Sequence, residues 1–318
     1  MPPDGVEWKP HEAMLSFEEF LRLCRIMAGL GIRKIKVTGG EPLVRRGVAS
    51  FIKNLRALPG IEKLTLTTNG LLLNAFLDEA ETPGSLPNGI NISLDALDPA
   101  RFRRFTRLDA LPDNPGAAGQ APQKITALLD RMLKMQIKVK INCVPVRGYN
   151  EEEILPLAAL AKEKDIAVRF IELMPLGNAR NLEPVPGSEV AALIEKACGA
   201  LTPFYGIEGN GPAVYYSLPG FSGKIGFINP ITQGFCETCN RLRVTSEGFL
   251  KPCLSCDSGL DLRNLLRAGA SDAELARAIT GAAAKKPHFH SFSPVYGEGS
   301  ARTEIIRQHP GGMYEIGG

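Results

Sequence analysis

Hydrophobic and polar positions follow two alternating patterns along the first half of the chain. A helix is expected to begin at Ser16, because Ser16 and Glu19 form a capping box ahead of an apolar run, and to end near Gly29 or Gly31. Short strand patterns then alternate with helical ones. The expected strands are residues 34–38, 63–67, 90–94, 139–144 and 167–171, and the expected helices between them are 47–57, 71–80, 123–135 and 151–164.

This strand–helix rhythm predicts an α/β fold, because units of this length join parallel strands through right-handed crossovers. Five strands fit either a partial β/α barrel or a doubly wound sheet. The chain opens with a loop-like stretch over residues 1–10 and then a helix, whereas a barrel unit starts with a strand. We therefore expect that a first strand is missing from the sequence.

The rhythm changes after the fifth strand. Residues 176–187 and 202–212 are rich in Gly, Pro and Asn, which is typical of loops. The patterns that follow predict a hairpin of residues 214–216 and 224–227 turning at Pro219 and Gly220, and helices near 261–268 and 272–284. We place a domain boundary at residue 178, which gives domains of residues 1–178 and 179–318.

Composition limits the class of protein. The 318 residues are 44% hydrophobic and 22% charged, as in ordinary soluble globular proteins, and the formal net charge of +3 is too small to indicate nucleic-acid binding. No apolar run approaches the roughly 18 residues of a membrane-spanning helix, and the first residues lack a signal-peptide pattern. We expect neither nucleic acid nor a membrane as a partner. The seven cysteines without a secretion signal favour the reducing cytoplasm.

The expected strands all end in residues suited to ligand contact. Ligands of parallel β/α folds sit at the carboxyl ends of the strands. Turns also favour Gly, Asn and Asp, so one such end is weak support, whereas five ends at one rim favour a ligand site. The ends carry Thr38 to Pro42, Thr67 to Gly70, Ser93 to Asp95, Asn142, and Glu172 to Pro175.

The loop Gly39-Gly40-Glu41-Pro42 is the most distinctive of these ends. Two glycines let a ligand approach the backbone closely, and Pro42 holds the preceding carboxylate in an extended conformation. Backbone carbonyls and Glu41 would then hold a ligand amine. The loop is neither a P-loop nor a dinucleotide-binding fingerprint.

Basic side chains recur on the expected strands. They are Lys34, Lys36, Lys138, Lys140 and Arg169, and the members of a pair two residues apart share one face of a strand. An inward-facing Lys or Arg is costly without an anion, so these residues favour a triphosphate site. The alternative is that they face helices, or solvent at a sheet edge.

Four cysteines lie close together, as Cys236-x2-Cys239-x13-Cys253 followed by Cys256. Cys-x2-Cys brings two thiolates to one metal, and a third from a later hairpin closes the site. Four thiolates would suit a zinc ribbon, and three would suit a [4Fe–4S] cluster with one open iron. The spacing leaves both metals open.

Arg241 and Arg243 lie between Cys239 and Cys253 and are expected to alternate on a strand. Paired guanidiniums next to a cluster would suit a phosphate clamp. Solvated surface charge is the alternative.

Six stretches carry a resemblance to a known family: RKIKVTGGEPLVRRG (33–47), LTTNGLLL (66–73), NISLDALDP (91–99), VRFIELMPLGN (168–178), FCETCNRLRVTSEGFLKPCL (235–254) and IGG (316–318). Together they resemble the MoaA family of radical S-adenosylmethionine (SAM) enzymes. The Gly-Gly-Glu-Pro loop is shared by many radical SAM enzymes, whereas the cysteine–arginine block with the Gly-Gly tail is more specific.

The resemblance implies a fold and an activity. The fold is a partial TIM-like barrel that lacks its first strand, with a C-terminal region that binds an iron–sulfur cluster. The activity is that of a lyase, the GTP 3',8-cyclase of molybdenum cofactor biosynthesis, which converts GTP to (8S)-3',8-cyclo-7,8-dihydroguanosine 5'-triphosphate. The cofactors are SAM and two [4Fe–4S] clusters.

The resemblance also assigns site residues. The SAM site comprises Gly39, Gly40, Glu41, Ser93 and Met174. The GTP site is lined by Lys36, Thr67, Lys140, Arg241 and Arg243, with Lys34 and Arg169 nearby. Lys36 stands where many members carry Arg. The second cluster, whose open iron binds guanine, is held by Cys236, Cys239 and Cys253, and the Gly317-Gly318 tail enters the active site.

Two features depart from the family. Its first cluster uses Cys-x3-Cys-x2-Cys directly before Met-Pro, and this sequence begins at Met1-Pro2 without those cysteines. That cluster supplies the electron that cleaves SAM, so we expect no radical chemistry from these residues alone. Cys256 is the second departure, since a fourth thiolate would block the open iron.

The implied partners are a reductant protein such as flavodoxin or ferredoxin, the downstream cyclic pyranopterin monophosphate synthase, and a second copy in a homodimer. Two other functions stay open. One is a GTP-binding remnant that never turns over, and the other is a zinc-ribbon protein whose barrel is only a scaffold.

Overall fold

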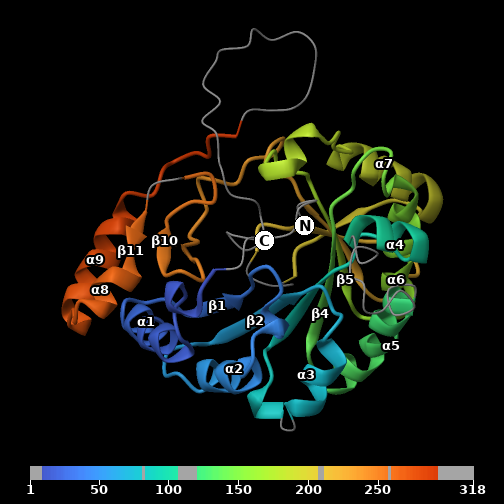
Figure 1. The fold of residues 1–318 in the computed structure, drawn as a ribbon. Helices are drawn as coiled ribbons and strands as arrows, with labels where there is room; N and C mark the ends of the chain where they lie inside the picture. The colour runs from blue at the N-terminus through green and yellow to red at the C-terminus, as the bar shows by residue number, and fades with distance from the viewer. Residues whose placement is uncertain (1–8, 81–82, 107–119, 207–210, 257–258, 293–318) are drawn as a thin grey trace, which may run out of the picture.

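An open, curved sheet forms the centre of the structure (Figure 1). The computed structural model describes residues 9–80, 83–106, 120–206, 211–256 and 259–292. Within these residues the main sheet has eight strands, in the order β1-β2-β3-β4-β5-β8-β7-β6. They are β1 (Lys34–Val37), β2 (Lys63–Thr68), β3 (Gly89–Ser93), β4 (Lys138–Cys143), β5 (Ala167–Ile171), β6 (Thr202–Phe204), β7 (Val214–Ser217) and β8 (Lys224–Ile228).

The pairing of these strands confirms the predicted fold class. From β1 through β5 to β8 every pairing is parallel, as the strand–helix rhythm predicted. The predicted hairpin is formed by β7 and β8, which pair antiparallel with Val214 opposite Phe227. Helices lie along the outer side of the parallel strands, which gives a partial β/α barrel (Figure 1).

The first helix begins at the predicted capping box. At the start of α1 the Ser16 hydroxyl accepts from Glu19 N at 3.2 Å and the Glu19 carboxylate accepts from Ser16 N at 2.7 Å, which confirms the capping box. The α-helices are α1 (Phe17–Gly29), α2 (Val48–Arg56), α3 (Leu73–Glu79), α4 (Pro99–Thr106), α5 (Ala121–Lys134), α6 (Ile154–Glu163), α7 (Gly187–Cys198), α8 (Leu262–Arg267) and α9 (Asp272–Ala284). Short 3-10 helices are η1 (His11–Ala13), η2 (Pro42–Val44), η3 (Pro83–Ser85), η6 (Glu151–Glu153) and η7 (Gly177–Asn181).

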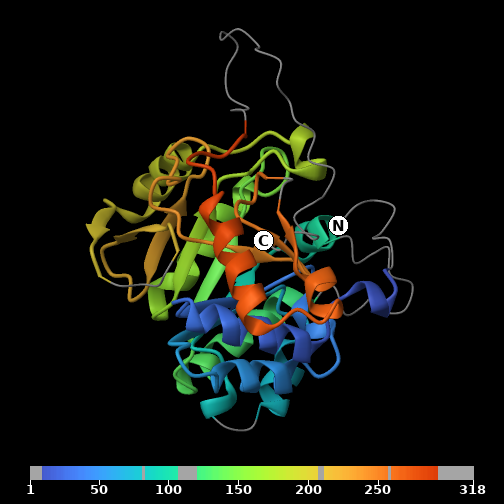
Figure 2. The same cartoon turned by 90° about the vertical axis from the view of Figure 1, so that its left-hand side faces the viewer.

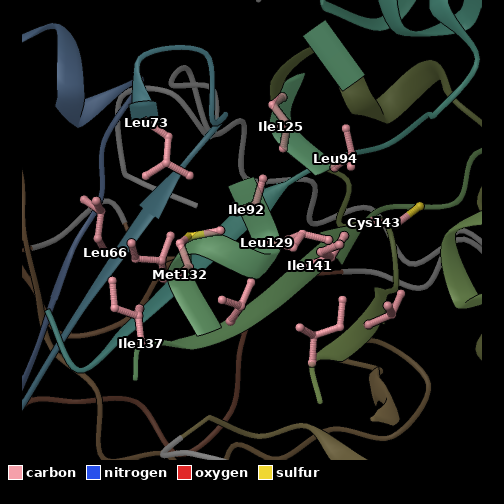
Figure 3. Close-up of a cluster of buried hydrophobic side chains, with 14 of the residues drawn as sticks. Leu66, Leu73, Ile92, Leu94, Ile125, Leu129, Met132, Ile137, Ile141 and Cys143 are labelled. Atoms are coloured by element: carbon pink, nitrogen blue, oxygen red, sulfur yellow. The ribbon is translucent and has the colours of Figure 1, made fainter. Parts of the chain in front are cut away.

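Strand alternation separates the two faces of the main sheet. On the outer face, Ile92 of β3 and Ile141 of β4 are buried in the main core with Leu129 of α5 (Figure 3). Their strand neighbours Asn91 and Lys140 point to the opposite side. We call this side, which faces away from helices α2, α3, α5 and α6, the inner face.

A second, smaller core joins the beginning and the end of the described chain. Leu23 of α1 packs with Leu250 of β10 and with Leu275 and Ile279 of α9. Figure 2 shows α8 and α9 beside α1. Strand β10 is the middle of a small antiparallel sheet made of β9 (Arg243–Val244), β10 (Phe249–Lys251) and β11 (Leu260–Asp261). This packing fixes the cysteine-bearing segment against the barrel.

The structure corrects three sequence-based expectations. Residues 202–204 form strand β6 inside a stretch expected to be a loop, and Pro203 is tolerated because β6 is an edge strand. Helix α4 was not predicted. The alternation of Arg241 and Arg243 on one strand is wrong, because β9 begins at Arg243. Strand β10, which pairs with β9, ends at Lys251, because the next residue, Pro252, has no N–H to extend the ladder.

The domain boundary expected at residue 178 stays a prediction. The main sheet continues across that position, since β6, β7 and β8 come from later residues. None of the helices that the structure describes is long and apolar enough to cross a membrane.

Candidate functional site

A row of polar and cationic side chains crosses the inner face of the sheet. The parallel register aligns Thr67 of β2 with Asn91 of β3 and Lys140 of β4, and Asn142 of β4 with Arg169 of β5. Residues two apart on a strand share a face, so Lys140 and Asn142 both point inward. The sheet therefore directs the predicted basic residues at positions 140 and 169 toward a common space.

Arg169 is held on this face by neutral amide oxygens. Its Nε and Nη2 donate to Asn142 Oδ1 at 2.8 and 2.5 Å, and Nη2 also donates to Asn91 Oδ1 at 2.9 Å. Asn91 in turn donates from Nδ2 to Thr67 Oγ1 at 3.0 Å. Because amides orient the guanidinium without neutralising it, the buried charge of Arg169 is kept for an anion.

Lys36 of β1 lies among guanidiniums from distant parts of the chain. Desolvation inside the barrel, followed by repulsion from Arg169, Arg241 and Arg243, lowers the pKa of Lys36 to about 8. The side chain of Lys36 is nevertheless exposed to solvent. We call Lys36, Lys140, Arg169, Arg241 and Arg243 the cation group.

The two arginines of the C-terminal segment connect the cation group to the cysteines. Burial, followed by repulsion from Arg241, lowers the pKa of Arg243 to about 10, and the thiols of Cys253 and Cys239 partly offset this. Arg241 donates from Nε and Nη2 to Cys239 Sγ, each at 3.4 Å. Burial opposes ionisation of Cys239, but the hydrogen bonds from Arg241 outweigh burial and lower the pKa of the thiol.

The four C-terminal cysteines are free and partly buried. Cys253 Sγ lies 3.3 Å from Ser255 Oγ, while burial, and then the neighbouring Cys253, raise the pKa of Cys256. In the part of the chain that the structure describes, no group of three or more His, Cys, Asp or Glu side chains is gathered for a metal ion. The predicted ligands at positions 236, 239 and 253 therefore stay a prediction.

Glu41 binds neighbouring loops of the protein at the rim of the barrel. Its Oε1 accepts from Leu43 N at 3.0 Å and Thr68 Oγ1 at 2.8 Å, and its Oε2 accepts from Asn69 N at 2.6 Å. The carboxylate thus joins the loop after β1 to the end of β2. A Cβ atom on Gly39 would meet nothing within 4 Å, so the backbone of this loop is open to a ligand.

Of the other predicted site residues, two lie at the same rim, one lies at the opposite ends of the strands, and two fall outside the described residues. Ser93 is exposed at the end of β3, Met174 is partly buried after β5, and Lys34 is exposed at the start of β1. Gly317 and Gly318 fall outside the residues that the structure describes.

Sequence reasoning did not single out two residues of the inner face, Asn91 and Tyr215. Lys140 Nζ donates to Tyr215 Oη on β7 at 3.1 Å. A polar Asn91 inside an apolar strand was an available signal, since a buried amide needs hydrogen-bond partners. Tyr215 gave no such signal, because aromatic residues are common in strands.

Comparisons with known proteins agree with this architecture. The chain matches the family described as Radical SAM superfamily over residues 3–161 and the one described as Molybdenum Cofactor Synthesis C over residues 166–292. It is also similar in fold to the crystal structure of Streptococcus suis SuiB, with a TM-score of 0.53 at 15% sequence identity. That similarity covers 84% of this chain and 62% of the SuiB chain. The protein is thus a radical SAM barrel protein, a class that uses a [4Fe–4S] cluster and SAM.

Similarity to curated relatives narrows the class. The chain is 39% identical over 318 residues to the GTP 3',8-cyclase of Clostridium perfringens (strain 13 / Type A), covering 100% of this chain and 92% of the relative. It is 41% identical over 307 residues to the GTP 3',8-cyclase of Moorella thermoacetica, covering 96% of this chain and 91% of the relative. The chain belongs to the MoaA family of GTP 3',8-cyclases.

Proposed function

We propose that the protein binds GTP on the inner face of the barrel and is a GTP 3',8-cyclase, joining ribose C3' to guanine C8 in molybdenum cofactor biosynthesis. The cation group carries this proposal. The groups that shift the pKa values of Lys36 and Arg169 are guanidiniums and a phenol, with no carboxylate among them in the described residues. A phosphate chain would accept hydrogen bonds from these cations and offset the positive charge gathered on the inner face.

The orientation of GTP follows from the two ends of the site. Lys36, Lys140 and Arg169, with the Thr67 hydroxyl, would bind the phosphates, and Lys34 lies at the exposed start of β1. Arg241 and Arg243 stand next to the cysteines. The guanine end would therefore point toward the C-terminal segment.

SAM would bind at the rim formed by the ends of β1, β3 and β5. The open backbone at Gly39, followed by the exposed Gly40, suits a ligand amine, while Ser93 is the last residue of β3 and Met174 follows β5. Glu41 has three hydrogen-bond donors from the protein, so its part would be to hold this loop in position.

The donor set of the C-terminal segment fits an iron–sulfur cluster. Its thiols are free, and Arg241 favours the thiolate of Cys239, which is the form that binds metal. Cys236, Cys239 and Cys253 would hold the cluster, with Cys256 outside its ligand set. When bound, a three-thiolate cluster offers an open iron for the guanine end of the substrate.

These 318 residues would hold the substrate without cleaving SAM. Their seven cysteines include no Cys-x3-Cys-x2-Cys, which the family uses for the cluster that reduces SAM. A flavodoxin or ferredoxin reductant, the downstream synthase and a homodimer stay predictions from the family, and a cytoplasmic location stays a prediction from the cysteines.

The metal is tested by anaerobic reconstitution of the protein with iron and sulfide. We expect a brown protein with about four irons per chain. A colourless protein with stoichiometric zinc would reject the cluster and favour the zinc ribbon.

The reaction is tested by extending the chain at its N-terminus with a Cys-x3-Cys-x2-Cys segment and incubating it with SAM, reductant and GTP. We expect the extended protein to form 5'-deoxyadenosine and 3',8-cyclised GTP. The Arg243→Gln variant should form neither product. The control variant Arg277→Gln, at an exposed arginine on α9, should form both. An extended, iron-loaded protein that yields neither compound would defeat the enzyme proposal.

A further inference from the structure

We propose that Tyr215 is a positioning residue, which holds Lys140 and Arg169 in place for the phosphate chain of the nucleotide, and that Gly226 provides the space for this arrangement. The inference rests on the proposed binding of GTP. It adds two residues from the β7–β8 hairpin, which lie outside the six stretches that carry the family resemblance.

The phenol oxygen of Tyr215 lies between two buried cations. Lys140 Nζ donates to Tyr215 Oη at 3.1 Å and stands 5.2 Å from the centroid of the ring. Arg169 also hydrogen-bonds with Tyr215, an interaction that raises the pKa of the guanidinium against the larger lowering by burial. The exposed fractions are 8% for Tyr215, 9% for Lys140 and 5% for Arg169, so water does little to stabilise either charge.

A phenol suits this position better than a carboxylate or a phenyl ring. A carboxylate between Lys140 and Arg169 would neutralise them and compete with phosphate. A phenyl ring would remove the acceptor and leave two buried donors to separate by mutual repulsion. The hydroxyl of Tyr215 orients both cations without placing a negative charge between them.

Gly226 of β8 lies directly between Tyr215 and Arg169. The antiparallel register sets Gly226 opposite Tyr215, and the parallel register sets it opposite Arg169. A Cβ atom at position 226 would lie 2.8 Å from Tyr215 Cε1 and 3.0 Å from Arg169 Cγ. A side chain there would therefore push the tyrosine and the arginine apart, and glycine lets them meet across the strand.

The adjacent Tyr216 offers a matched control. It lies on the same strand but packs against the main core, edge-on to Phe227 with ring centroids 5.7 Å apart. Tyr216→Phe removes a hydroxyl from the same hairpin without touching the cation group.

The experiment compares the affinities of the full chain for GTP, GDP and GMP by calorimetric titration. In Tyr215→Phe, GTP should bind about 10- to 100-fold more weakly, because a hydrogen bond to charged groups is lost from each cation. The loss should shrink from GTP to GDP to GMP. Gly226→Ala should show the same graded loss, and Tyr216→Phe should match the unaltered protein.

Failure of the inference is distinguishable from failure of the proposed function. An unaltered protein that binds no GTP defeats the proposed function. An unaltered protein that binds GTP, together with a Tyr215→Phe variant that binds all three nucleotides normally or loses them equally, overturns the positioning role. If Gly226→Ala does not fold, as judged by circular dichroism, Tyr215→Phe decides the question alone.

Discussion

Arg169 and Asn142 face each other across β5 and β4, where the guanidinium donates from Nε and Nη2 to one amide oxygen at 2.8 and 2.5 Å. Several other arginines of the described residues pair with carboxylates, as Arg147 does with Glu189 at 2.7 Å. The amide fixes the direction of Arg169 without cancelling its charge. The positive charge of Arg169 is therefore not neutralised by Asn142, whereas a carboxylate neutralises the charge of Arg147. This difference is the physical basis for phosphate binding.

Changing Asn142 to Asp tests this distinction directly. The new carboxylate keeps the shape of the amide but pairs with Arg169 and repels phosphate, so we expect GTP affinity to fall by about tenfold or more. Calorimetric titration measures the affinity, and thermal unfolding checks that the ligand-free protein is no less stable. Asn54→Asp on the exposed side of α2 is the control and should bind GTP normally. Unchanged affinity in Asn142→Asp would contradict the account.

The sequence predicted the parallel strands because their patterns are local. Each strand between residues 34 and 171 is a short segment in which apolar residues alternate with polar ones, between helical patterns, and each is found in the structure. Strand β6 contains Pro203, so its identity depends on an edge position that only the assembled sheet defines.

The candidate site was predictable in its residue types and less so in its geometry. Lys36, Lys140 and Arg169 are recognisable as basic residues on strands, but the face they occupy depends on register. The contact of Tyr215 with Lys140 spans 75 positions in the sequence, and no local pattern encodes it. The mutual repulsion of Lys36 with Arg241 and Arg243 likewise depends on long-range packing.

Binding of GTP should depend on pH through Lys36. Its folded pKa of about 8 lies below the ordinary lysine value of about 10.4, so the unfolded chain binds more protons between these values. The ligand-free protein should therefore gain stability as pH rises through this window. Phosphate favours the protonated lysine, so GTP affinity should fall above pH 8, with proton uptake on binding.

Lys36→Arg should abolish this pH dependence, because a guanidinium stays protonated throughout the range. Titrations in buffers of different ionisation enthalpy, from pH 7 to 9.5, measure both affinity and proton uptake. If the GTP affinity of Lys36→Arg falls with pH as steeply as that of the unaltered protein, a group other than Lys36 titrates.

Glu41 should contribute to stability through the loop that it holds. Glu41→Ala removes the acceptor for Leu43 N, Thr68 Oγ1 and Asn69 N, so we expect the free energy of unfolding to fall by about 1–3 kcal/mol. Urea denaturation measures this change, and Glu62→Ala, at an exposed position, is the control. Equal stability of the two variants would refute the structural role.

The iron ligands can be separated by single serine substitutions. Changes at Cys236, Cys239 or Cys253 should each abolish the bound cluster, whereas Cys256→Ser should keep about four irons per chain, because three thiolates suffice for a cluster with an open iron. Iron analysis and absorption spectra after anaerobic reconstitution provide the measurement. Cys198→Ser on α7 controls for general thiol loss. Loss of the cluster in Cys256→Ser would revise the ligand set.

The most direct measurement of the central claim is a titration of the ligand-free protein with GTP and with guanosine at several salt concentrations. The account predicts that GTP binds at least about 100-fold more tightly than guanosine, since several charge-assisted hydrogen bonds depend on the phosphates. The advantage should shrink with added salt and in Lys36→Gln. Equal affinity for the two ligands, or an affinity for GTP that ignores both salt and Lys36, would contradict it.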